Sequence, residues 1–354
     1  MKGILSVCII TKNESANLRR CLESLKVYPF EIVVVDTGST DDTKQMAAEY
    51  TQCIYDFAWC DDFSAAKNYA IGRASHDMVM VLDSDEYVSE LDVDKLRELI
   101  AARRSRGQVG RIRRHNLLTR DGEQTVNMEW INRIFSRELF HYEGRIHEQV
   151  TAAAGGDYET YQAPVTILHS GYEGSQEDRR RKAERNIRLL LQEFEENPAD
   201  TYCMYQLGKS YYMAGNYPKA VRYFELALGY DLEPKLEYVI DMVETYGYAL
   251  LKCGQAETAL GLSGVYDAFG GTADFKLLMG LIYMNNEMFE EAVQEFERAA
   301  CCRECRTIGA NSYLAWYNAG VIRECLGDVK AAADYYAKCG DYKKAKERLR
   351  QLGG

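Results

Sequence analysis

The sequence is poor in proline, has no long apolar run, and carries no excess of positive charge. Only five of its 354 residues are proline, which argues against long disordered or proline-rich linkers. No apolar run reaches the ~18 residues that a membrane-spanning helix needs, so we expect no transmembrane segment. Lysine and arginine total 43 against 54 aspartates and glutamates, a formal net charge of -11. That balance argues against a nucleic-acid-binding protein, which needs a dominant basic face.

Cysteine is present but is not arranged as a disulfide framework. The 11 cysteines are odd in number and scattered along a long chain, which is typical of a protein kept in a reducing cytoplasm. The first apolar run lacks a small-residue cleavage site and passes directly into polar residues, so we interpret it as a buried strand and not as a signal peptide. We therefore predict a cytoplasmic location.

Strand and helix patterns alternate through residues 1–175. Continuous apolar runs, typical of strands buried on both faces, occur at residues 4–10, 31–35 and 78–82. Between them, Ser39 and Asp42 are expected to form a capping box that opens a helix running through Tyr50. This alternation predicts a mostly parallel, Rossmann-like α/β sheet. Ligands of such sheets bind at the carboxyl ends of the strands.

From residue 176 onward only helical patterns occur, and they repeat. Four glycines each precede an alanine by 12 residues, in the pairs Gly208–Ala220, Gly247–Ala259, Gly280–Ala292 and Gly320–Ala332. An aromatic residue follows the alanine by four positions in three copies, whereas the second copy has Ser263 there. This pattern resembles the tetratricopeptide repeat. We predict a helical linker at 176–200 and an all-α domain over 201–354, with four repeats and a cap helix.

Acidic residues stand at the ends of three predicted strands. Glu14 follows the first strand, Asp36 follows the second directly, and Asp83 and Asp85 follow the third in the sequence D-S-D-E. Residues i and i+2 of an extended strand point the same way, so the two aspartates are expected to converge on one hard cation. A divalent metal there would stabilise a departing diphosphate.

These segments resemble the ordered motifs of glycosyltransferase family 2, which has the GT-A fold. The similar segments are SVCIITKNE, EIVVVDTGSTDDT, DDFSAAKN and MVLDSDE. The resemblance implies a nucleotide pocket lined by Thr11, Asn13, Glu14 and Asp36, the last on the base or ribose. It also implies that Asp83, with Ser84 beside it, faces the ribose or the metal. Asp85 would bind the metal, and Lys67 would lie near the base or diphosphate unless it is only a solvated helix residue.

Residues 128–150 carry the next cluster of polar and large side chains. Inverting sugar transfer needs a general base to take the acceptor proton. The family places an acid in this region, often as E-D, whereas this chain has H-E. We assign Glu148 as the base and His147 as the second choice, with a structural pair as the alternative. Arg133 is expected to hold the diphosphate or to form an ordinary salt bridge, and Trp130 to contact the acceptor.

His169 ends the α/β domain, directly after an apolar run. Many GT-A enzymes place a histidine there as a metal or diphosphate contact, and an imidazole suits manganese alongside carboxylates. The resemblance therefore adds His169 to the two aspartates as a metal ligand. The alternative is that His169 has only a structural role.

Together these motifs predict an inverting, metal-dependent glycosyltransferase that uses Mn²⁺ or Mg²⁺ and a nucleotide-sugar, by resemblance a UDP-sugar. Its repeats would hold a peptide or protein acceptor or a second copy of the chain in a homodimer, since repeat domains present extended concave surfaces. The fusion resembles the peptide S-glycosyltransferases that modify bacteriocin cysteines, and also bacterial enzymes for cell-surface polysaccharides. The alternative from another class is a non-catalytic scaffold that senses a nucleotide-sugar.

Overall fold

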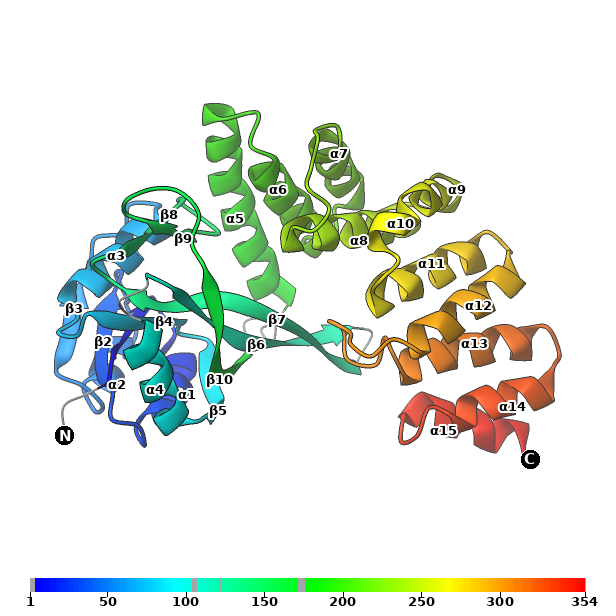
Figure 1. The fold of residues 1–354 in the computed structure, drawn as a ribbon, viewed down its shortest axis with the longest axis horizontal. Coiled ribbons are helices and arrows are strands. Elements are labelled where there is room, and N and C mark those ends of the chain that lie inside the picture. Colours follow the sequence, from blue (N-terminus) through cyan, green and yellow to red (C-terminus); the bar gives the residue numbers. More distant parts are fainter. Residues whose placement is uncertain (1–3, 104–106, 121–122, 171–175, 354) are drawn as a thin grey trace. The chain divides into compact units, whose positions relative to one another are not determined.

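The computed structural model describes residues 4–103, 107–120, 123–170 and 176–353. The chain divides into two compact units, Met1–Gln176 and Glu177–Gly354, which Figure 1 shows as an α/β part and an all-helical part. Each unit is treated by itself below. No helix among the described residues is long and apolar enough to cross a membrane.

An eight-stranded sheet forms the centre of the first unit. Its strand order is β3-β2-β1-β4-β7-β6-β10-β5. The strands are β1 (Ser6–Thr11), β2 (Glu31–Asp36), β3 (Cys53–Asp56), β4 (Met78–Asp83), β5 (Glu86–Leu91), β6 (Val109–Arg120), β7 (Glu123–Ser136) and β10 (Thr160–His169). Strands β3, β2, β1 and β4 are parallel, whereas β7 is antiparallel to β4 and to β6. Two short strands, β8 (Phe140–Glu143) and β9 (Gln149–Ala152), pair separately.

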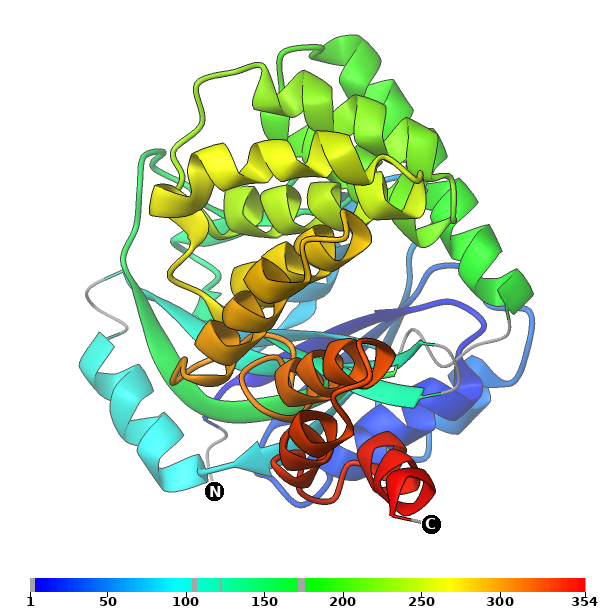
Figure 2. The same ribbon diagram turned by 90° about the vertical axis from the view of Figure 1, so that its right-hand side faces the viewer.

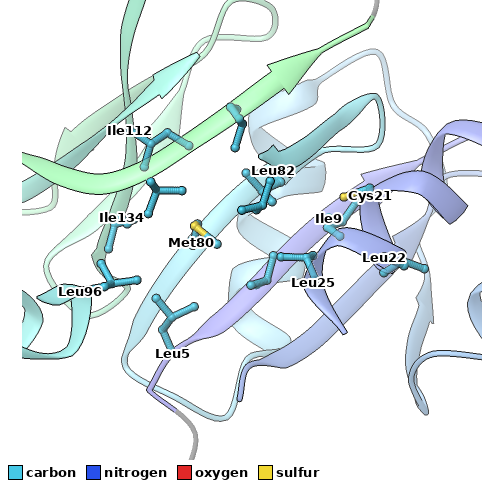
Figure 3. Close-up of a cluster of buried hydrophobic side chains, with 14 of the residues drawn as sticks. Leu5, Ile9, Cys21, Leu22, Leu25, Met80, Leu82, Leu96, Ile112 and Ile134 are labelled. Carbon is cyan, nitrogen blue, oxygen red and sulfur yellow. The ribbon is translucent and has the colours of Figure 1, made fainter. Parts of the chain in front are cut away.

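Helices cover both faces of this sheet, because alternate residues of each buried strand point to opposite faces. The helices are α1 (Ser15–Leu25), α2 (Thr43–Ala47), α3 (Phe63–Arg73) and α4 (Val93–Arg103). In β1, Ile9 packs with Leu22 of α1 in one core cluster, which Figure 3 shows. Its neighbour Cys8 packs with Ala70 of α3 in another cluster. The parallel strands therefore end at one common edge, where Thr11 pairs in register with Asp36.

The helix expected to run through Tyr50 is shorter than predicted. It ends at Ala47, and its N-cap residue Asp42 makes no capping hydrogen bond with its side chain, whereas Asp41 accepts the N–H of Thr43 at 3.0 Å. The predicted capping box is wrong because Ser39 is used elsewhere, as the hydroxyl acceptor for the Asn13 N–H.

The second unit consists of helices that succeed one another along the chain, as Figure 2 shows. They are α5 (Gln176–Glu196), α6 (Thr201–Met213), α7 (Tyr217–Leu228), α8 (Glu237–Lys252), α9 (Ala256–Ala259), α10 (Tyr266–Phe269), α11 (Ala273–Asn285), α12 (Phe289–Ala300), α13 (Tyr313–Cys325), α14 (Val329–Ala337) and α15 (Lys343–Leu352). We expected residues 176–200 to form a separate helical linker. The second unit begins at Glu177, so all of α5 after its first residue belongs to that unit.

Glycine-to-aromatic contacts explain the repeat signature. A Cβ atom on Gly280 would lie 2.4 Å from a ring carbon of Phe296, and one on Gly320 would lie 2.6 Å from a ring carbon of Tyr336. The second copy differs: Gly247 faces Leu262 and Leu278 instead. Ser263 stands there in place of the large side chain, and the second helix of that copy is divided into α9, a 3₁₀ turn and α10.

Candidate functional site

Two buried polar atoms at the carboxyl edge of the sheet have no hydrogen-bond partner among the residues that the structure describes. They are Oγ1 of Thr11 and Oδ2 of Asp36, which end the neighbouring strands β1 and β2. The other carboxylate oxygen of Asp36 accepts the N–H groups of Gly38 and Ser39 at 3.0 and 2.8 Å. Asp36 is only 2% exposed, so its orientation is fixed while one oxygen stays unsatisfied.

The loop after β1 is tied to the loop after β2. Asn13 adopts a left-handed backbone conformation with φ 53°. Its N–H donates to Oγ of Ser39 at 2.9 Å, and its Oδ1 accepts the N–H of Thr40 at 2.7 Å. The N–H of Glu14 donates to Oγ1 of Thr43, whereas its carboxylate accepts from Asn17 of α1. The structure thus places the four predicted pocket residues on one pair of linked loops and strand ends.

A cluster of buried charges lies at the end of β4. Nζ of Lys67 is 2.7 Å from Oδ1 of Asp83 and 2.5 Å from Oε1 of Glu148. Nη2 of Arg133 is 2.8 Å from Oδ2 of Asp83 and 3.0 Å from Oε1 of Glu86. Lys67 of α3 and Arg133 of β7 therefore meet at Asp83, and Lys67 also binds Glu148 of the turn before β9.

The cations of this cluster decide the ionisation of Asp83. Burial by itself would raise the pKa of the Asp83 carboxyl, but Arg133 and Lys67 hold that pKa well below its ordinary value. Burial would likewise lower the pKa of the Lys67 ammonium, but Asp83 and Glu148 raise it. Lys67 is 3% exposed, so the alternative of a solvated helix residue is wrong for it.

A second row of polar side chains, which the sequence did not predict, supports this cluster. Glu86 is fully buried, and its Oε2 accepts the N–H of Asp83 at 2.9 Å. Nη1 of Arg114 lies 3.1 Å from Glu86, and Nη2 lies 2.8 Å from Glu129. Glu86 was visible in the sequence as the last letter of D-S-D-E, but Arg114 and Glu129 come from the β6–β7 pairing, which leaves no local signal.

Asp83 and Asp85 do not follow one extended strand. Residue Asp83 ends β4, and Ser84 and Asp85 form the turn to β5. The argument that residues i and i+2 point the same way is therefore wrong here. Asp83 contacts Lys67 and Arg133, whereas Oδ1 of Asp85 lies 3.6 Å from Nε2 of His169. Within the described ranges, no group of three acidic, histidine or cysteine side chains is placed to hold a metal ion.

The Asp85–His169 pair nevertheless has the chemistry of a partial cation site. The side-chain amide nitrogen of Asn116 donates to Glu129. The Oδ1 atom of Asn116 therefore accepts from Nδ1 of His169, and these two atoms are 2.7 Å apart. Nε2 of His169 and Oδ1 of Asp85 lie 3.6 Å apart, and metal-binding histidines are typically oriented by such a hydrogen bond at their other ring nitrogen. Mg²⁺ is commonly bound by one or two carboxylates together with substrate phosphates. The residues present therefore fit a metal that the substrate helps to hold.

Trp130 is not part of the charged cluster. It lies opposite Arg113 in the β6–β7 pair. The guanidinium of Arg113 is 5.0 Å from the centre of the Trp130 ring. Neighbouring residues of a strand point to opposite faces, so Trp130 points away from the face that carries Glu129. There it lines a cavity of about 510 Å³ together with Glu90 and Lys95. His147, next to Glu148, has a left-handed backbone with φ 53°.

Comparisons with known proteins agree with this architecture. Residues 6–162 match the model of glycosyl transferase family 2. The chain is 30% identical over 264 residues to a TPR repeat-containing protein of Synechococcus elongatus, covering 72% of this chain and 62% of that protein. It is 23% identical over 222 residues to the prophage-derived glycosyltransferase SunS of Bacillus subtilis, and the match covers 62% of this chain and 52% of SunS. The chain thus spans less than two thirds of the length of these curated relatives. Among solved structures, the TPR protein YrrB superposes with a TM-score of 0.40 at 21% identity, covering 48% of this chain and 84% of YrrB.

Proposed function

Because residues 6–162 match the model of glycosyl transferase family 2, we propose that the protein transfers a sugar, with inversion, from a UDP-sugar to an acceptor side chain. The unsatisfied atoms of Thr11 and Asp36 carry this proposal. A buried polar atom without a hydrogen bond costs about 1–3 kcal/mol, so a ligand that satisfies both atoms is strongly favoured. They lie at the strand ends, where ligands of parallel α/β sheets bind.

A uracil ring complements these two atoms. Oδ2 of Asp36 can only accept a hydrogen bond when ionised, and the Thr11 hydroxyl can donate one. Uracil offers one ring N–H between two carbonyl oxygens, so it satisfies an acceptor and a donor that lie side by side. The diphosphate would extend from there toward the end of β4, where Asp85 and His169 would hold Mn²⁺ or Mg²⁺. The metal supplies positive charge that stabilises the departing diphosphate.

The acceptor proton is assigned to Glu148, with His147 as the alternative base. Lys67 fixes the Glu148 carboxylate through Oε1 at 2.5 Å, which keeps its second oxygen available to the acceptor. Arg133 and Lys67 already neutralise Asp83, so their role in this proposal is to orient Asp83 and Glu148. Because Arg133 and Lys67 hold the pKa of Asp83 well below its ordinary value, Asp83 stays ionised although it is buried.

A peptide or protein is the proposed acceptor, held by the repeats. Repeat arrays present extended surfaces that suit polypeptides, and the relatives of this chain include a TPR repeat-containing protein and a glycosyltransferase. A cell-surface polysaccharide is the alternative acceptor. A non-catalytic sensor of nucleotide-sugars is the alternative function, and it predicts binding without release of UDP.

Release of UDP from a panel of UDP-sugars, with and without manganese, tests the proposal. We expect metal-dependent release from one sugar, a loss of release in Asp36→Asn and Asp85→Asn, and no change in Asp94→Asn. Asp94 is the matched control because it is an exposed acid that pairs only with Arg97 within its own helix, as far as the structure describes. A wild-type rate in Asp85→Asn would refute the metal assignment. Binding without release would favour the sensor.

A further inference from the structure

A tyrosine side chain in the charged cluster lacks the hydrogen bond that its burial demands. Tyr142 lies in β8 and is 3% exposed. Its hydroxyl has no hydrogen-bond partner among the residues that the structure describes. Its ring centre is 5.4 Å from Nζ of Lys67 and 5.6 Å from the ring centre of Phe135. The phenol thus lies beside the cation that joins Asp83 and Glu148.

The backbone of Tyr142 is held in place by Asn68, the neighbour of Lys67 on α3. The N–H of Tyr142 donates to Oδ1 of Asn68 at 2.9 Å, and its carbonyl oxygen accepts from Nδ2 of Asn68 at 2.8 Å. Both backbone polar groups of Tyr142 are thus bound to one side chain of α3. The unsatisfied hydroxyl is therefore built into the same helix–strand contact that positions Lys67.

The surroundings of the phenol keep it neutral and able to donate. Burial raises the pKa of Tyr142, and the nearby charges of Arg133 and Lys67 oppose this without reversing it. At neutral pH the group is thus an O–H donor next to two cations. A phosphate oxygen would be a matching acceptor, because it can accept the hydrogen bond that the phenol otherwise lacks.

We propose that the Tyr142 hydroxyl donates a hydrogen bond to a diphosphate oxygen of the bound nucleotide-sugar. This inference rests on the proposed function and adds a residue to its site. Neither the strand-end motifs nor the H-E pair indicated it, since Tyr142 reaches the site through the separate β8–β9 pair.

Two other tyrosines serve as matched controls for removal of one hydroxyl. The Tyr158 hydroxyl is satisfied: it donates to the carbonyl of Val150 at 2.6 Å and accepts from Asn132 at 3.0 Å. The Tyr161 hydroxyl is buried and has no hydrogen-bond partner within the described ranges, like that of Tyr142. It lies beside Arg103, away from the charged cluster. Tyr161 thus has an unsatisfied hydroxyl like that of Tyr142, but this hydroxyl lies away from the charged cluster.

The experiment compares the full-length variants Tyr142→Phe, Tyr158→Phe and Tyr161→Phe with the wild type. The Kd of UDP and of uridine is measured by calorimetry with manganese present, and Tm is measured without ligand. We expect Tyr142→Phe to weaken UDP binding about ten- to a hundredfold, as for a lost hydrogen bond to a charged group, and to leave uridine binding unchanged. Its Tm should equal or exceed that of the wild type, whereas Tyr158→Phe should lower Tm and Tyr161→Phe should leave UDP binding unchanged.

Three outcomes would overturn the inference. Equal UDP affinity in Tyr142→Phe and wild type would show that the hydroxyl does not contact the diphosphate. A fall in Tm as large as that of Tyr158→Phe would show that the hydroxyl has a structural partner. If the wild type binds no UDP at all, the proposed function fails and this inference fails with it.

Discussion

At the scale of single residues, the donor site depends on how buried charges are shared. Lys67 forms ion pairs with Asp83 and Glu148, and Arg133 forms ion pairs with Asp83 and Glu86. Burying an ion pair is costly, but breaking one by removing a single partner costs more because the other charge stays buried. The side chains at the end of β4 are therefore interdependent.

Replacing Lys67 by Met should destabilise the first unit by about 3 kcal/mol, since Glu148 loses the cation that faces it. Urea denaturation followed by circular dichroism measures this loss. The matched control is Lys44→Met, because Lys44 pairs with Asp56 on the surface, where the two side chains are 44% and 74% exposed. That control should leave the unfolding midpoint nearly unchanged. Equal midpoints for both variants would mean that the Lys67 pairs contribute no stability.

At the scale of elements, the helix pairs of the second unit depend on the absence of a side chain at one position. Phe296 is fully buried against Gly280, and Tyr336 is similarly placed against Gly320. The second copy, which lacks the large partner, has a second helix that is divided into short pieces. The glycine and the aromatic residue therefore act as one unit of packing.

Gly280→Ala should lower the free energy of unfolding of the second unit by about 2 kcal/mol, because the new methyl group overpacks against the Phe296 ring. Adding Phe296→Leu should restore part of the loss. The matched control is Gly261→Ala, since a Cβ at Gly261 meets nothing within 4 Å. A loss in the control as large as in Gly280→Ala would show that helix geometry, not packing, explains the effect.

Three carboxylates from α8 and α11 surround Arg306 in the second unit. The Arg306 guanidinium pairs with Asp241 and Glu244, and the backbone N–H groups of Arg306 and Thr307 donate to Asp274. Burial, together with Asp274 and Asp241, raises the pKa of Glu244 to about 7, although Arg306 opposes this. The folded state then holds a proton that the unfolded chain releases near the ordinary glutamate value.

Stability of the second unit should therefore fall as the pH rises from about 4.5 to about 7. A pKa raised in the folded state stabilises it below the unfolded value, and this contribution, on the order of 3 kcal/mol, is lost as the pH passes the folded value. Unfolding midpoints in guanidinium chloride across this range measure it. Glu244→Gln should flatten the dependence, whereas the exposed Glu257→Gln should not. An unchanged slope in Glu244→Gln would contradict the assignment.

At the scale of the whole molecule, the two units have separate hydrophobic cores. The clusters around β1 and β4 contain residues of the first unit, and those around α11 to α15 contain residues of the second. Units with separate cores unfold separately when few contacts join them.

Calorimetry should therefore resolve two unfolding transitions. UDP with manganese should raise the midpoint of only one of them, because a ligand stabilises the unit that binds it. Gly280→Ala should lower only the other. A single transition that responds to both changes would show that the units unfold cooperatively.

The sequence predicted much of the site because parallel strands end at one edge. Asp36 and Asp83 directly follow apolar runs, so strand assignment placed them near one another, and the family resemblance added Thr11. The sequence assigned no role to Glu86, although Glu86 is the last letter of D-S-D-E. It did not predict Arg114, Glu129 or Tyr142 as site residues, because they reach the cluster through the pairing of distant strands. Nor did it predict that Trp130 points away from the face of Glu129, because register decides which face a side chain takes.

The sequence by itself determined the types of the elements, the change from α/β to all-helical structure, and the glycine–aromatic spacing of the repeats. These features depend on local periodicity, which any short window contains. The tertiary structure alone decided that Lys67 and Arg133 neutralise Asp83, that the chain turns at Ser84 and Asp85, and that the hydroxyl of Tyr142 stays unsatisfied. Those outcomes depend on contacts between residues far apart in the chain, and on the burial that such contacts create.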